Sequence, residues 1–281
     1  MLRLLPPVLL VVFPVLAFAA KPANPWSKFR TPAPGTPLSI GKPSAGCLRG
    51  GEPLKESGPG YVLARPERRR NFGHPRLIAL LKGLGTELVV EKKPAILVGD
   101  LSQPRGGPTL SAHASHESGL DADVWYSRPK PGAPKSPRWI RKHVAAERMV
   151  DATGFKADAV RFGETQIDLL RRLASRDEVD RILVNFPLKK FLCEHHASEA
   201  WIRKVRPWYG HDHHFHVRVR CPEDDRSCVA GEPIPEGNGC DATLEWWWSE
   251  EARGEDKKNT DREEHPVMPE LPKECAALAS P

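Results

Sequence analysis

The chain has 281 residues, a formal net charge of +6 and a hydrophobic fraction of 40%, which together suit a folded protein with one sizeable core. Its basic clusters, such as residues 65–70, are short and lack interleaved aromatic residues, so we predict no binding to nucleic acid. A mildly basic surface is better suited to a polyanionic envelope.

The N-terminus has the features of an export signal. Arg3 is followed by an apolar stretch at residues 4–16 and then by Ala17-Phe18-Ala19, the small-x-small pattern cut by signal peptidase. We therefore expect residues 1–19 to be a cleaved signal peptide. A membrane anchor is the alternative, but this stretch is shorter than the ~20 apolar residues that span a bilayer, and no later stretch approaches that length. The sequence thus predicts an exported chain without a membrane span.

The mature chain begins irregularly and then becomes regular. Residues 20–60 are rich in Pro, Gly and Ser and predict an ordered arm or wrapping loop. An apolar stripe at helical spacing covers residues 74–84, with Gly85 as its stop. A short apolar run predicts a buried strand at residues 95–100, and the Pro and Gly residues after it predict a loop over 101–112.

Helices and strands alternate in the second half. We expect strands at residues 122–126, 181–185 and 214–220, and helices at 139–150, 165–174 and 198–205. Because this order lacks a regular βαβ rhythm, the sequence favours an α+β fold, a central antiparallel sheet with flanking helices. Residues 249–274 alternate charges and prolines and are expected to be solvated or disordered.

The last predicted strand carries a His-x-His pair. Side chains two residues apart point to the same face of a strand, so His214 and His216 share a face with Arg218, while Phe215 and the alternate valines after it face the core. The polar face would then be a cleft wall. A histidine pair at this spacing also arises by chance, and the strand alone does not decide between the two.

A second group of metal-capable side chains lies earlier in the chain. His113, His116, Asp121 and Asp123 fall within one short run, in which Gly119 allows a turn. Zinc is commonly held by three nitrogen or oxygen ligands, with one position left for water, and the two runs can supply them. A capping or turn cluster on a surface loop is the alternative, but it does not explain two such groups. The sequence therefore predicts a zinc cleft on the sheet.

The six cysteines are expected to form three disulfides. They are an even number in a chain predicted to enter an oxidising compartment, and none lies in a C-x-x-C pair of the kind that structural zinc sites use. Cys221 and Cys228 are close enough to close a small loop. Six cysteines allow 15 connectivities, so spacing alone does not specify the others.

Several strings resemble known families. Ser115-His116-x-x-Gly119-x-x-x-Asp123 together with His214-x-His216 resembles the signature of the lysostaphin and D-alanyl-D-alanine metallopeptidase superfamily. Within it, four longer strings are similar to the penicillin-insensitive murein endopeptidase family: Asn71–Pro75, Ala112–His116, Val205–Trp208 and His216–Cys221. The similarity runs from about Trp26 to Cys275 and includes all six cysteines.

The resemblance implies a set of functional residues. The zinc ligands would be His116, Asp123 and His216, the catalytic histidines His211 and His214, and His113 an additional metal contact. It also implies the disulfides Cys47–Cys275, Cys193–Cys240 and Cys221–Cys228. The chain departs from some relatives in one respect, because residues 151–158 contain no histidine. A complete second metal site is therefore not carried over.

The function implied by the resemblance is cleavage of peptidoglycan peptide cross-links in the periplasm, chiefly the D-alanyl to meso-diaminopimelyl bond. Such a zinc hydrolase needs no serine nucleophile and should ignore penicillin. The alternatives are a D,D-carboxypeptidase or dipeptidase of the same superfamily, or a non-catalytic peptidoglycan-binding protein. We expect a catalytic domain at residues 20–248 and a Pro- and charge-rich tail at 249–281 anchored through Cys275. Nothing in the sequence specifies an oligomeric state.

Other features have more than one interpretation. Arg218 either meets a carboxylate of the peptide stem or is a solvated charge at the cleft edge. Residues 246–248 are three tryptophans, which could stack on sugars but more commonly pack a terminal segment onto the core. His195 and His196 have no spaced partner and are expected on the surface.

Overall fold

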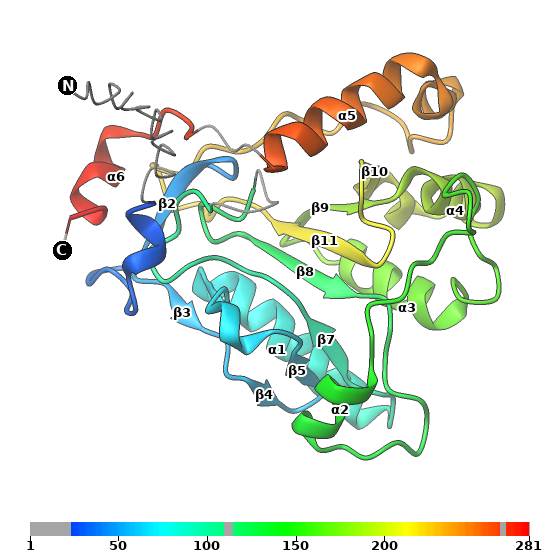
Figure 1. Cartoon of the computed structure of the whole chain (residues 1–281), viewed down its shortest axis with the longest axis horizontal. Helices are drawn as coiled ribbons and strands as arrows, with labels where there is room; N and C mark the ends of the chain where they lie inside the picture. Colours follow the sequence, from blue (N-terminus) through cyan, green and yellow to red (C-terminus); the bar gives the residue numbers. More distant parts are fainter. Residues whose placement is uncertain (1–23, 110–114, 265–267, 281) are drawn as a thin grey trace, which may run out of the picture.

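The computed structural model describes residues 24–109, 115–264 and 268–280. At its centre is a seven-stranded sheet, and the helices α1 (Pro75–Val90) and α3 (Glu164–Ala174) pack against it (Figure 1). Two small two-stranded sheets lie outside it. The fold is therefore mixed α and β.

The strands of the central sheet follow the order β10-β9-β11-β8-β7-β5-β4. Their bounds are β4 Ser57–Gly58, β5 Tyr61–Leu63, β7 Ile96–Val98, β8 Asp121–Trp125, β9 Val179–Val184, β10 Val205–Pro207 and β11 His214–Val219. Strand β11 pairs antiparallel with both β8 and β9, but β10 runs parallel to β9 and β5 runs parallel to β7. The sheet is mixed, so the predicted antiparallel sheet is wrong. Each parallel pair has a helix between its strands, α1 between β5 and β7 and α4 (Phe186–His196) between β9 and β10.

The remaining strands form the two small sheets, β1 (Leu38–Lys42) with β2 (Ala45–Arg49) and β3 (Glu52–Pro53) with β6 (Phe72–Gly73). The arm expected at residues 20–60 thus contains a hairpin. The other helices are α2 (Pro137–His143), α5 (Glu250–Glu264) and α6 (Lys273–Leu278), and the 3-10 turns are η1 (Trp26–Lys28), η2 (Pro66–Arg68), η3 (Ala200–Lys204) and η4 (Ala242–Trp248).

Three predicted helices need correction. Helix α1 does not stop at Gly85 but continues to Val90, and the glycine serves another purpose: a Cβ there would lie 2.4 Å from the carbonyl oxygen of Pro59. Helix α2 ends at His143 instead of Val150, and the chain beyond it crosses to the loop before β11, where the N–H of Met149 donates to the carbonyl of Asp212. The helix predicted at residues 198–205 is only the short turn η3, and Val205 already begins β10.

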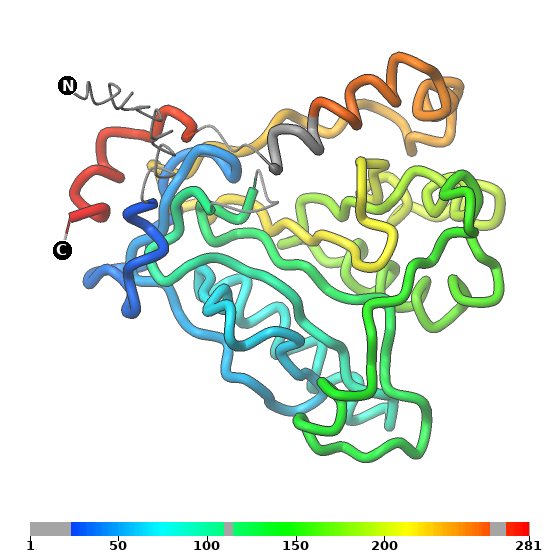
Figure 2. Tube along the Cα trace, in the orientation of Figure 1, coloured from blue at the N-terminus to red at the C-terminus, as the bar shows by residue number. Residues whose placement is uncertain are grey.

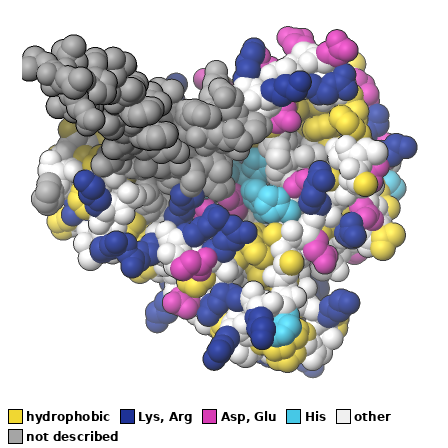
Figure 3. Space-filling model, in the orientation of Figure 1, with side chains coloured by type: hydrophobic (Ala, Val, Ile, Leu, Met, Phe, Trp, Pro, Cys, Tyr) yellow, Lys and Arg dark blue, Asp and Glu magenta, His cyan; other side chains and the backbone are white. Residues whose placement is uncertain are grey.

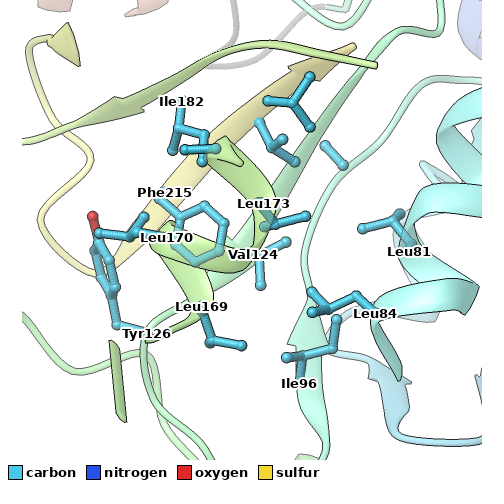
Figure 4. Close-up of a cluster of buried hydrophobic side chains, with 14 of the residues drawn as sticks. Leu81, Leu84, Ile96, Val124, Tyr126, Leu169, Leu170, Leu173, Ile182 and Phe215 are labelled. Carbon is cyan, nitrogen blue, oxygen red and sulfur yellow. The ribbon is translucent and has the colours of Figure 1, made fainter. Parts of the chain in front are cut away.

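The hydrophobic core lies between one face of the sheet and the helices. Figure 4 shows the fully buried side chains of both helices against those of the strands: Leu81, Leu84, Leu170, Leu173, Val124, Ile182 and Phe215. Phe215, Val217 and Val219 are all buried in this core. The predicted alternation along β11 is confirmed, and its opposite face carries the histidines.

The two ends of the described chain meet on one side of the molecule (Figure 2). Cys47 of β2 is bonded to Cys275 of α6, and Trp26 and Ile40 pack around this disulfide. The other disulfides are Cys193–Cys240 and Cys221–Cys228. All three are the pairs that the family resemblance implies.

The tail is more ordered than its composition predicts. Residues 250–264 form α5, so this part is not disordered, but most of its described side chains are exposed, as the solvated alternative expected. Glu, Lys and Arg favour a helix even on an exposed segment. Just before it, Trp247 stacks on Phe186 with ring centroids 6.2 Å apart, and Trp248 meets the same ring edge-on at 4.7 Å. The tryptophans therefore pack the terminal segment onto the body. Within the described ranges, no helix has the length and apolar character needed to cross a bilayer.

Candidate metal centre

Strands β8 and β11 bring the two metal-capable runs side by side. In their antiparallel register, His216 lies opposite Asp123 and Arg218 lies opposite Asp121. His116 comes from the loop that enters β8. Candidate ligand atoms of His116, Asp123 and His216 all lie within 4.8 Å of one another, and all three residues are buried. Two imidazoles and a carboxylate at this separation could hold a metal ion.

The backbone of the loop before β8 brings His116 to this position. His116 has φ +67° and Gly119 has φ +77°, both in the left-handed region. A Cβ at Gly119 would also lie 2.7 Å from Leu48 Cδ2, so this turn requires glycine for space as well as for conformation. The turn predicted at Gly119 is confirmed. A left-handed histidine is a strained conformation of the kind that clusters at functional sites.

Asp121, which the sequence placed among the metal-capable side chains but not among the zinc ligands, supports the cluster from behind. Its carboxylate is fully buried and accepts hydrogen bonds from Arg218 Nε at 2.6 Å and from the Ser115 hydroxyl at 2.9 Å, and it lies 2.8 Å from His216 Nε2. Its backbone oxygen lies 3.3 Å from His116 Nδ1. The other nitrogens, His116 Nε2 and His216 Nδ1, lie 3.3 and 3.4 Å from Asp123 Oδ1. Such outer partners fix the tautomer and orientation of metal ligands.

Arg218 belongs to this support. Its guanidinium also donates to the Ser115 hydroxyl at 3.0 Å, and its side chain is only 14% exposed. The interpretation of Arg218 as a solvated charge is therefore wrong.

The electrostatics of the cluster favour a cation. Burial by itself would raise the pKa of Asp123, but His214 and His116 outweigh burial and hold that pKa well below its usual value. Burial would likewise raise the pKa of Asp121, and Arg218 and His216 hold it low. Burial would lower the pKa of His216, yet Asp121 raises it to about 9. Two buried carboxylates therefore remain charged behind the histidines.

His211 and His214 adjoin the cluster. The ring centroid of His211 lies 5.0 Å from that of His214 and 5.8 Å from that of His216, and His214 Nε2 lies 3.5 Å from Asp123 Oδ1. His211 comes from the loop before β11 and has φ +56°. Burial, with the like charges of His214 and His216, holds the pKa of His211 well below its usual value. His211 is therefore a neutral imidazole at pH 7.

A chain of polar groups leads away from His214. His214 Nδ1 lies 3.2 Å from His213 Nε2, and His213 Nδ1 lies 2.9 Å from Asp212 Oδ1, which the sequence did not predict. Because β11 begins only at His214, strand alternation does not apply to His213. Arg148 in turn pairs with Asp212. The chain could stabilise a proton held at His214.

The histidines face solvent on one side. His211, His213 and His214 are half-buried, whereas the His116, Asp123 and His216 cluster is buried. Figure 3 shows a patch of histidine surface near the centre of this face, flanked by acidic and basic side chains. A molecule in solution can therefore reach the site.

The other histidines do not join the site. His113 lies outside the described residues. His195 and His196, at the end of α4, contact the carbonyl of Phe191 and the carboxylate of Glu199, and His195 is exposed as predicted. Among the described residues, no other group of three His, Cys, Asp or Glu side chains comes as close together as His116, Asp123 and His216.

Comparison with known proteins agrees with the motifs. Residues 39–280 match the family model described as penicillin-insensitive murein endopeptidase. Relatives of that name include the Yersinia enterocolitica protein, 36% identical over 96% of this chain and 94% of its own, and the Klebsiella pneumoniae protein, 37% identical over 91% of each. The Pectobacterium atrosepticum protein is 36% identical over 94% of this chain and 92% of its own. The chain belongs to the penicillin-insensitive murein endopeptidase family.

Proposed function

We propose that this protein is a zinc-dependent endopeptidase that hydrolyses the peptide cross-links of peptidoglycan. Its family makes it a peptidase that acts on murein. The observation that carries the proposal is the buried cluster of His116, Asp123 and His216 with His211 and His214 beside it.

The donor set suits zinc. Two imidazole nitrogens and one carboxylate oxygen match catalytic zinc sites, whereas calcium and magnesium prefer oxygen ligands alone. His116, Asp123 and His216 would hold the ion, and His113 remains an additional contact proposed from the family resemblance. When bound, zinc supplies a Lewis acid that activates water and polarises the scissile carbonyl.

His211 and His214 are proposed to handle protons and developing charge. His214 takes the proton of the attacking water and delivers it to the leaving amine, and the chain through His213 to Asp212 stabilises its protonated form. His211 lies beside it and donates a hydrogen bond to the oxygen on which negative charge develops. None of these steps needs a serine nucleophile.

The bond proposed is the cross-link between D-alanine and meso-diaminopimelate. The test is mass spectrometry of muropeptides after purified, zinc-loaded protein acts on cross-linked dimers. We expect conversion of dimers to monomers, equally with and without penicillin, and loss of activity with phenanthroline.

Each other product pattern identifies an alternative. Release of single stem-end residues from monomers would identify a carboxypeptidase or dipeptidase, and binding to sacculi without any cleavage would identify a non-catalytic binding protein. Inhibition by penicillin with indifference to the chelator would point to an acyl-enzyme and overturn the proposal.

We further propose export to the periplasm. Residues 1–19 would be removed as a signal peptide, residues 20–248 would form the catalytic domain, and the tail at 249–281 would be held through Cys275. The three disulfides support this proposal, because such bonds persist in oxidising compartments. N-terminal sequencing of the periplasmic protein would test it, and a chain that begins at Met1 would contradict it.

A further inference from the structure

A cavity of about 260 Å³ opens beside the catalytic histidines and is not used by the mechanism above. One wall is the loop before β11, where Gly210 and Asp212 flank His211. The opposite wall is α5, through Ala252, Arg253 and Asp256. The tail helix therefore forms part of a cavity that begins one residue from His211. Its volume suits one amino-acid side chain.

The lining combines aromatic rings with charges of both signs. Phe186, Tyr209 and Trp247 form an aromatic wall, in which the rings of Tyr209 and Trp247 lie 4.8 Å apart. The lining also holds Arg148 and Asp212, which pair with each other, and the charged residues Arg253 and Asp256 of α5. A cation and an anion on one wall suit a ligand that carries one charge of each sign. The rings suit a methylene chain that leads to it.

The distance along a peptide stem limits which part of the substrate can reach this cavity. Each extended residue covers about 3.3–3.6 Å. When the scissile carbonyl lies at the metal cluster, the neighbouring residue of the stem can therefore reach a cavity that starts beside His211. The sugar is joined at the far end of the stem, several residues away. A side chain next to the scissile residue is therefore the occupant that fits.

We propose that this cavity binds the free α-amino-carboxylate end of the diamino acid that precedes the scissile D-alanine. This inference rests on the proposed function. Arg253 pairs with the carboxylate, Asp256 accepts from the ammonium, and the aromatic wall packs along the methylenes. The tail helix thus contributes to substrate choice.

The experiment compares two synthetic cross-linked dimers with zinc-loaded protein. They differ only in the donor-stem diamino acid, which is diaminopimelate in one and lysine, without the second carboxylate, in the other. For the wild type we expect kcat/KM about tenfold lower on the lysine dimer, mainly through KM. Arg253→Gln should lose this discrimination. Lys257→Gln, the same charge change on the same helix but outside the cavity, should keep it.

The outcomes separate the inference from the proposed function. The inference is overturned if the wild type has equal kcat/KM on the two dimers, or if Arg253→Gln still discriminates between them. In either case, cleavage of the dimers would still support the proposed endopeptidase activity. No cleavage of either dimer would overturn both. A further comparison uses the diaminopimelate dimer with and without its sugars. If the dimer without sugars has the higher KM in the wild type but not in Arg253→Gln, the cavity binds the glycan and the inference is wrong.

Discussion

At the scale of single residues, the geometry of the site depends on which ring nitrogens of His116 and His216 face Asp121 and which face Asp123. Asp121 lies against one nitrogen of His216, and its backbone oxygen faces one nitrogen of His116, so the second nitrogen of each ring turns toward Asp123. Neither imidazole can rotate without losing a contact to Asp121. These contacts therefore fix the orientation of both imidazoles.

The first prediction concerns metal content. Each of His116→Ala, Asp123→Ala and His216→Ala should lose the zinc, because each removes one of three protein ligands, while the wild type should hold about one zinc per chain. His195→Ala, which removes an exposed histidine outside the site, is the control and should retain the metal. Plasma mass spectrometry of dialysed protein measures the content. Stoichiometric zinc in the His116→Ala and Asp123→Ala proteins would show that the ligands are misassigned.

The second prediction separates proton transfer from metal binding. His211→Ala and His214→Ala should keep zinc near the wild-type content, while the turnover rate falls on the order of 10²- to 10⁴-fold, the range for losing a positioned acid or base. Zinc and turnover are measured on the same preparations. Loss of zinc in His214→Ala as large as that in His216→Ala would mean that the two histidines of β11 have been exchanged.

Part of this site could be predicted from residue spacing. Alternation along β11 put His214 and His216 on the face opposite the core, because the strand period is two regardless of the rest of the fold. The support by Asp121 could not be predicted, since it depends on the register that sets Arg218 opposite Asp121. The nearness of His211 to the cluster depends on a left-handed residue in a loop, which no periodicity indicates.

At the scale of elements, α4 shows why a helix can be missed. Its buried face includes Lys189 between Leu188 and Leu192, and a charge in that position interrupts the apolar stripe. The lysine is tolerated because its ammonium donates to the carbonyls of Ile202 at 3.0 Å and Asn238 at 2.7 Å. Without α4, the crossover to β10 and the parallel pair it allows could not be predicted.

The third prediction uses two glycines of α1. Gly83→Ala should stabilise the protein by about 0.5–1 kcal/mol, because alanine favours a helix and the nearest atom to the new Cβ is Arg176 Nη1 at 3.8 Å. Gly85→Ala should destabilise it by about 1–3 kcal/mol, because its Cβ would press on Pro59 at 2.4 Å. Urea unfolding of both variants measures the difference. Equal effects of the two substitutions would show that Gly85 is not required for this close contact.

At the scale of the whole molecule, the N-terminal hairpin and the loop that carries His116 are joined through Glu117. Its carboxylate accepts a hydrogen bond from the backbone N–H of Gly46 at 3.1 Å, and its backbone N–H donates one to the carbonyl of Pro43. Burial raises the pKa of Glu117 to about 7 although the bond from Gly46 opposes this. The folded protein therefore holds a proton that the unfolded chain releases near the ordinary carboxyl pKa.

The fourth prediction follows from this difference. A raised carboxyl pKa gives stability that is fully present below about pH 4.5 and is lost as the pH rises through about 7. Glu117→Gln keeps an acceptor for Gly46 without the charge, so its free energy of unfolding relative to wild type should improve by about 2–3 kcal/mol between pH 4.5 and pH 8. The exposed Glu194→Gln is the control and should show no such change. A Glu117→Gln difference that does not vary with pH would contradict the prediction.

The disulfide between β2 and α6 also sets an order of events during biosynthesis. Cys47 emerges early and its partner Cys275 emerges 228 residues later, after Cys193, Cys221, Cys228 and Cys240 have all appeared. Chains are made from the N-terminus, so Cys47 must stay reduced, or exchange out of wrong pairs by thiol attack, until the last segment arrives. The bond between Cys47 and Cys275 can therefore form only after the last segment has been made, and a chain truncated before residue 275 leaves Cys47 without its partner in the first hairpin.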